Sequence, residues 1–71
     1  MIHSYEESVE YLTSHGWRKT SSGAYVKNGH ELVFDTSHYV ELYGSDGVWL
    51  SESRIDSVQD LVRFIQVNRL C

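Results

Sequence analysis

The residues of this chain that could do chemistry are scattered and form no catalytic or metal-binding pattern. The histidines lack metal-ligand spacing such as His-x-x-x-His on one helix face, and the single cysteine has no second thiol to help it. Asp35, Ser37 and His38 have the residue types of a nucleophilic triad, but neighbours on one short connection cannot readily orient one another. We therefore predict no catalytic residue, no metal site and no cofactor. The histidines and the cysteine are His3, His15, His30, His38 and Cys71.

A carboxylate pair is the remaining candidate for acid-base chemistry. Asp35 and Glu41 are expected on adjacent strands of one sheet face, but acid-base work needs a desolvated pocket that separates the two pKa values. A flat open sheet supplies no such pocket. Gly23, Gly29 and Gly47 each belong to a turn signal, so no glycine-rich phosphate cradle is left. The sequence thus favours a protein that is not an enzyme.

Two amphipathic helices are predicted at the two ends of the chain. Ser4 with Glu7 three residues later is a capping box, which starts a helix over Tyr5–His15, and Gly16 can end it in the left-handed conformation. Trp17 should then fold back into the core. Ser57 caps a second helix that runs to about Arg69, with Ile55 before it as part of a hydrophobic staple and Asp60 completing a capping-box variant. The apolar stripes of these helices consist of Tyr5, Val9 and Leu12, and of Val58, Leu61, Val62 and Ile65 with Phe64 alongside.

Turn signals between the helices predict an antiparallel meander of five strands. Asn28-Gly29 is a strong two-residue hairpin signal, while Ser21–Gly23 and Ser45–Gly47 suit three-residue hairpins closed by a glycine bulge. Residues 36–38 make a weaker polar connection. The strands are expected at about 17–20, 24–27, 30–35, 39–43 and 48–52. One domain over residues 1–71 results, an α+β two-layer sandwich with α-β-β-β-β-β-α order in which both helices cover one sheet face.

The predicted registers agree on which sheet face is apolar. They set Tyr25 opposite Leu32, Leu32 opposite Leu42, and Leu42 opposite Leu50. A slip by one residue in any strand would scramble this agreement. The expected core face is Trp17, Tyr25, Leu32, Phe34, Val40, Leu42 and Leu50, with Lys19 and Lys27 of the same parity on outer strands, where they discourage pairing with another chain.

The opposite face combines aromatic with acidic residues, and no element remains to cover it. One interpretation is a solvated face whose cross-strand aromatic pairs only stabilise the sheet, by about 0.2–1 kcal/mol each. The other is a docking surface, since Tyr and Trp are enriched at interface hot spots and carboxylates attract a basic partner. The candidate contact residues are Glu31, Val33, Asp35, Tyr39, Glu41, Tyr43 and Trp49, and Ala24 and Val26 share their parity.

Composition favours a small acidic interaction module. Its 71 residues carry a net charge of −4, which repels phosphate backbones and favours a cationic partner. Single-stranded nucleic acids do stack on open aromatic sheets, but Lys and Arg frame such faces, so nucleic acid is not the expected partner. No stretch is long enough to span a membrane and no secretory signal is present, and one cysteine suits a reducing compartment, so we expect a cytoplasmic protein.

Three alternatives remain open for the function. In the first, the chain is a phage or mobile-element inhibitor whose acidic aromatic face binds a basic or nucleic-acid-handling host protein. Homodimerisation through the same face would bury the aromatics in an isologous interface. The third is a ribonuclease-toxin-like domain. The stretch His15-Gly16-Trp17-Arg18, followed by Ser22-Gly23 and two strands, resembles the opening of HicA-type messenger-RNA-cleaving toxins, which have a helix, three strands and a helix.

That resemblance implies a fold like that of double-stranded-RNA-binding domains. It does not extend to the activity, because those toxins are basic and carry a histidine just after a glycine-serine pair. This chain is acidic and has Ala24 and Tyr25 after Ser22-Gly23.

Overall fold

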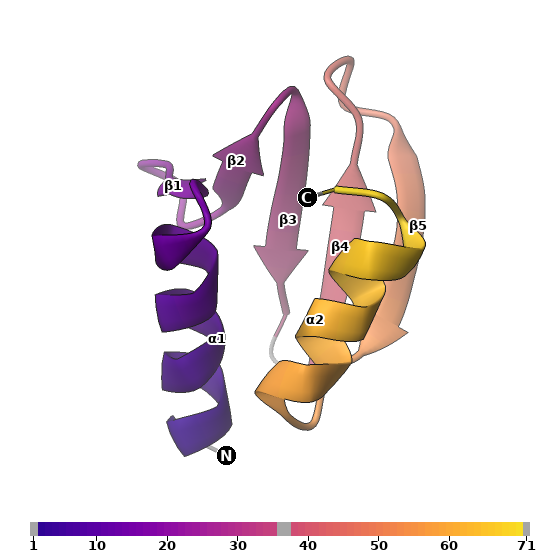
Figure 1. Ribbon diagram of the computed structural model, residues 1–71. Helices are drawn as coiled ribbons and strands as arrows, with labels where there is room; N and C mark the ends of the chain where they lie inside the picture. The colour runs from indigo at the N-terminus through magenta and orange to yellow at the C-terminus, as the bar shows by residue number, and fades with distance from the viewer. Residues whose placement is uncertain (1, 36–37, 71) are drawn as a thin grey trace.

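A five-stranded antiparallel sheet with a helix at each end of the chain forms the structure (Figure 1). The computed structural model describes residues 2–35 and 38–70. The strands lie across the sheet in the order of the chain, so the predicted α+β meander is confirmed. The elements are α1 (Ile2–Ser14), β1 (Arg18–Lys19), β2 (Tyr25–Lys27), β3 (His30–Phe34), β4 (Tyr39–Tyr43), β5 (Trp49–Arg54) and α2 (Val58–Val67).

Both helices end in the same backbone motif, which turns the following apolar residue into the core. Gly16 has a φ of 93°, and Trp17 N–H donates to Leu12 O over 2.9 Å. Leu70 N–H likewise donates to Ile65 O over 3.0 Å, with Arg69 in the left-handed region. These are Schellman bonds, and they leave Trp17 and Leu70 buried. The role of Gly16 and Trp17 was predicted, whereas that of Leu70 was missed.

The helix starts differ in how well they match the prediction. α1 begins at Ile2, two residues before the predicted cap at Ser4, so Ser4 lies inside the helix. In α2 the prediction is confirmed, because Ser57 Oγ accepts a hydrogen bond from Asp60 N–H over 3.4 Å. The carboxylate of Asp60 in turn accepts from Asp56 N–H over 2.9 Å. α2 ends at Val67, two residues before the predicted end at Arg69.

The predicted hairpin registers are confirmed from β2 to β4. Tyr25 pairs with Leu32 and Leu32 with Leu42, as the turn signals required. Asn28 and Gly29 both have positive φ, 52° and 83°, which is the two-residue turn that this dipeptide favours. The sheet therefore holds its apolar residues on one face as expected.

The register between β4 and β5 differs from the prediction because of a bulge. Leu42 pairs with Ser51 and Tyr43 with Trp49, so Leu50 is the extra residue and is 48% exposed instead of buried. β5 also runs on to Arg54, two residues past the predicted end. Beyond the bulge, Ser51 and Ser53 have the parity of the core face, and Glu52 and Arg54 have the opposite parity.

The core lies between the sheet and both helices. Leu12 of α1 packs with sheet residues and with Leu61 and Ile65 of α2 in one cluster. Ser8 of α1 is also buried, beside the apolar stripe of that helix. Tyr5, predicted as part of that stripe, is 48% exposed, although its ring meets Phe34 edge-on with centroids 5.7 Å apart.

No helix in residues 2–35 and 38–70 is long and apolar enough to cross a membrane. Ser37, considered for a triad, and Cys71 lie outside the described residues.

Candidate functional site

The sheet face opposite the core, here called the outer face, brings together six of the seven predicted contact residues. Antiparallel pairing sets Glu31 opposite Tyr43, Val33 opposite Glu41, and Tyr43 opposite Trp49. Side chains opposite each other on one face are close enough to interact. The outer face consists of Arg18, Val26, Glu31, Val33, Tyr39, Glu41, Tyr43, Trp49, Glu52 and Arg54.

Two residues predicted for this face are placed differently. Asp35 lies just past the end of β3, where its carboxylate accepts a hydrogen bond from Tyr39 N–H over 3.1 Å and its own N–H donates to Tyr39 O over 3.0 Å. It therefore closes the connection between β3 and β4. Ala24 is 4% exposed and lies before β2, where its N–H donates to Thr20 Oγ1 over 3.1 Å and its O accepts from Thr20 N–H over 2.8 Å. Neither residue belongs to the open outer face.

Glu52 and Arg54 are outer-face residues that the sequence reasoning missed. The predicted register placed Leu50 toward the core and gave Glu52 the same parity, which would have directed a carboxylate into an apolar layer. That conflict was the available signal for a bulge, since an unpaired buried charge is strongly unfavourable. With the bulge in place, Glu52 lies opposite Glu41, and Arg54 lies opposite Tyr39.

Tyr43 lies at the centre of the acidic part of the face. Its hydroxyl donates a hydrogen bond to Glu41 Oε1 over 2.8 Å. This bond to a carboxylate raises the pKa of Tyr43, and partial burial and the charges of Glu41, Glu31 and Glu52 raise it further. The three carboxylates therefore share one neighbourhood although they come from three strands.

These carboxylates have no cationic partner within the described part of the chain. The ion pairs there join Arg54 to Asp56 over 3.0 Å and Arg63 to Asp60 over 4.0 Å. Arg54, the cation nearest to Glu52 on β5, directs its Nε to both oxygens of Asp56. Glu41 and Glu52, which lie directly opposite each other, therefore place two like charges side by side without a paired cation.

Apolar side chains lie exposed next to the carboxylates. Trp49 is 51% exposed, and its neighbours Val48 and Leu50 are 53% and 48% exposed. The bulge explains this run, because it takes Leu50 out of the alternating pattern that would have buried it. The remaining outer-face residues on β3 and β4 are half-buried by one another.

The described histidines do not converge on a site. His15 follows α1, where its ring stacks on Tyr11 with centroids 4.0 Å apart and its Nδ1 lies 2.7 Å from Tyr11 O. His30 starts β3, and His38 precedes β4 with a φ of 66°. Across residues 2–35 and 38–70 no three His, Cys, Asp or Glu side chains are grouped to hold a metal ion.

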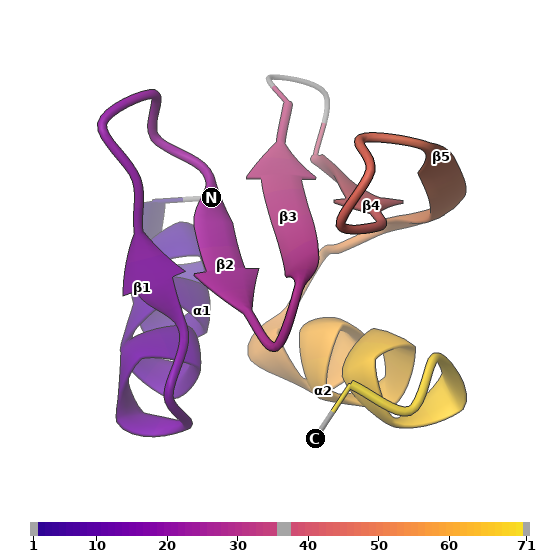
Figure 2. The same cartoon turned by 90° about the horizontal axis from the view of Figure 1, so that it is seen from above.

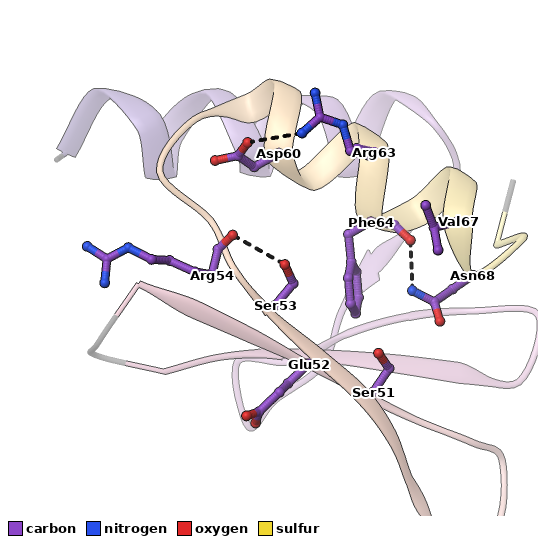
Figure 3. Close-up of a pocket in the computed structure, with 9 residues that line it drawn as sticks. All are labelled: Ser51, Glu52, Ser53, Arg54, Asp60, Arg63, Phe64, Val67 and Asn68. Carbon is purple, nitrogen blue, oxygen red and sulfur yellow. Dashed lines mark hydrogen bonds and ion pairs between the residues drawn. The ribbon is translucent and has the colours of Figure 1, made fainter.

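A shallow hollow lies between β5 and α2 (Figure 3). Its volume is about 400 Å³. Ser51 and Ser53 point into it from the strand and Phe64 points down from the helix, while Glu52 points to the opposite side of the sheet. Two small serines thus stand where larger side chains would fill the space beneath α2.

The geometry therefore offers an acidic, aromatic surface beside a free sheet edge. Comparison of the chain with protein-family models, with curated proteins and with solved structures found no match.

Proposed function

We propose that this chain is a protein-interaction module that acts by binding, and that its outer face contacts a partner with a basic surface. The observation that carries the proposal is the group of three carboxylates, Glu31, Glu41 and Glu52, around Tyr43 without a facing cation. Such a group costs the isolated fold stability. On binding, a basic partner would relieve the repulsion between the carboxylates. Their negative charge would also steer the partner to the face.

The exposed aromatic residue beside the carboxylates supports the same proposal. Trp49 presents a large apolar surface at low cost in side-chain entropy, and tryptophan is enriched among the residues that dominate binding energy. Charge around an apolar anchor provides both orientation and affinity. Nucleic acid is disfavoured as the ligand because the carboxylates would face its phosphates.

The test is affinity capture from a lysate of the native host with matched charge variants. The face variant is Glu41→Gln with Glu52→Gln. The control is Glu6→Gln with Glu10→Gln on exposed positions of α1, which changes the net charge by the same amount. We expect wild type and the control to capture a basic protein that the face variant and Trp49→Ala both fail to capture. The circular dichroism spectra of the variants should match that of wild type. Identical partner lists for all four proteins would refute the proposal.

A further inference from the structure

The open edge of the sheet has backbone groups that point to solvent. β5 is the last strand in the sheet order and is six residues long (Figure 2). Ile55 N–H donates to His38 O over 2.6 Å, so by antiparallel alternation the backbone groups of Ser53 and Ser51 also point to β4. The N–H and C=O groups of Glu52 and Arg54 consequently point to the free edge, where another strand can pair with them, although Arg54 O also accepts a long hydrogen bond of 3.4 Å from Ser53 Oγ.

The two sides of this edge differ in chemistry. On the core side lies the hollow of about 400 Å³ beneath α2, where Phe64 and the 72% exposed Val67 are the apolar residues in an otherwise polar lining that includes Asp60 and Arg63. On the outer side lie Glu52, with Glu41 opposite it on β4, and Arg54, whose guanidinium is paired with Asp56. Because side chains of a strand alternate between the faces, a strand added to β5 would present every second residue to the carboxylates and the others to the hollow.

We propose that the partner contributes an extended segment that adds to the sheet beside β5, with Lys or Arg at alternate positions and small apolar residues between them. This inference rests on the proposed function and specifies the partner's chemistry and mode of binding. Backbone hydrogen bonds to Glu52 and Arg54 would supply affinity, and the alternating pattern would supply specificity.

The net charge of the chain disfavours a second copy of it as the added strand. In the register that sets Glu52 opposite Glu52, pairing two β5 strands would bring together two carboxylates that already face Glu41. Each copy also has a net charge of −4. A basic segment removes this repulsion and a second copy doubles it.

Two capped seven-residue peptides of identical composition test the inference. One alternates Lys and Val, and the other has its Lys residues in one block and its Val residues in another. We expect the alternating peptide to bind at least about tenfold more tightly, which corresponds to about 1.4 kcal/mol. Nuclear magnetic resonance should show hydrogen-exchange protection at the amides of Glu52 and Arg54 when it binds.

Backbone N-methylation of the alternating peptide tests for strand pairing directly. In an antiparallel addition the residues opposite Glu52 exchange hydrogen bonds with it, so methylation at the Lys positions blocks binding and methylation at the Val positions does not. In a parallel addition the effects are reversed. Equal effects of the two methylation patterns would overturn the inference, as would self-association of the protein through β5 in place of peptide binding.

The result also separates this inference from the proposed function. If both peptides bind equally and both lose affinity in the variant with Glu41→Gln and Glu52→Gln, the strand addition is wrong and the acidic face still binds basic partners. If that variant binds like wild type, the proposed function fails as well.

Discussion

At residue 43 a tyrosine hydroxyl lies among three carboxylates, which ties its ionisation to the fold. Hydrogen bonding to Glu41, partial burial and the neighbouring carboxylates raise the pKa of Tyr43, so the folded state favours the neutral phenol. A pKa raised by folding contributes stability that is fully present below the unfolded value of 10.0 and is lost as pH rises through the folded value. Tyr43 therefore contributes to alkaline unfolding.

Glu41→Gln should lower the pKa of Tyr43 toward its ordinary value. The substitution keeps a side-chain oxygen that can accept the hydroxyl's hydrogen bond but removes the charge. Nuclear magnetic resonance titration of the tyrosine ring measures the change, with Glu10→Gln on α1 as the control. An unchanged titration of Tyr43 in Glu41→Gln would show that this carboxylate does not control the hydroxyl.

Glu52→Gln should stabilise the protein and reduce its dependence on salt. The substitution removes the repulsion with Glu41 directly opposite, worth about 0.2–1 kcal/mol in the free energy of unfolding. Salt screens the same repulsion, so the gain should shrink as ionic strength rises and the Debye length falls below about 8 Å. Urea unfolding at low and high salt measures both effects. A stability loss at low salt would mean that Glu52 has a favourable partner.

At the scale of the element, α1 contains a buried hydroxyl without compensation. Ser8 is 1% exposed, and its Oγ has no hydrogen-bond partner among the described residues. A buried donor without a partner costs about 1–3 kcal/mol, and serine is also a weaker helix former than alanine. The helix thus packs against the sheet despite this residue.

Ser8→Ala should raise the free energy of unfolding by about 1 kcal/mol or more, because it removes an unpaired polar group and adds helix propensity. Urea unfolding measures the effect. Ser14→Ala is the matched control in the same helix, since Ser14 is exposed and its hydroxyl donates to Tyr11 O over 3.0 Å. Its substitution should have little effect or reduce stability. A destabilising Ser8→Ala would show that the hydroxyl is satisfied in solution, for example by a buried water.

The elements also show what local sequence signals can predict. Asn28-Gly29 fixes a turn by its backbone preference, and the turn fixes the pairing of Tyr25 with Leu32, so this part of the sheet followed from the chain alone. The bulge at Leu50 did not follow from the chain alone, because it depends on how β5 pairs with β4. Over short stretches the alternation of side chains looks the same with or without the extra residue. That single shift gives Ser51 and Ser53, instead of Leu50 and Glu52, the parity of the core face.

The same shift limits how much of the candidate site was predictable. Glu31, Glu41 and Tyr43 lie on strands whose registers were predicted from the Asn28-Gly29 turn and from the polar connection at residues 36–38, and they are placed as expected. Glu52 lies past the bulge and therefore escaped prediction. Asp35 was assigned to a strand by extending alternation, whereas its carboxylate bonds the backbone of Tyr39 and ends the strand instead.

At the scale of the whole molecule, acidic charge lies where the sheet is otherwise most able to associate. The free edge at β5 and the exposed run from Val48 to Leu50 are features that promote pairing with other chains. Glu52 and Glu41 lie beside them on the outer face. Under the proposed function, the carboxylates would discourage association through this edge, and the same charges would select a basic partner.

The variant with Glu41→Gln and Glu52→Gln should consequently self-associate under conditions in which wild type is a monomer. Removing both charges leaves the exposed aromatic surface and the open edge without repulsion between copies, while the fold itself gains stability. Sedimentation equilibrium over a range of protein concentrations measures the association, and the control with Glu6→Gln and Glu10→Gln separates the position of the charge from its amount. If wild type already forms a dimer with the same dissociation constant as the variant, the prediction is wrong. The outer face is then buried in a symmetric interface that tolerates its carboxylates. If instead both variants stay monomeric, the exposed apolar run is too small to drive association, and the carboxylates of β4 and β5 serve partner recognition alone.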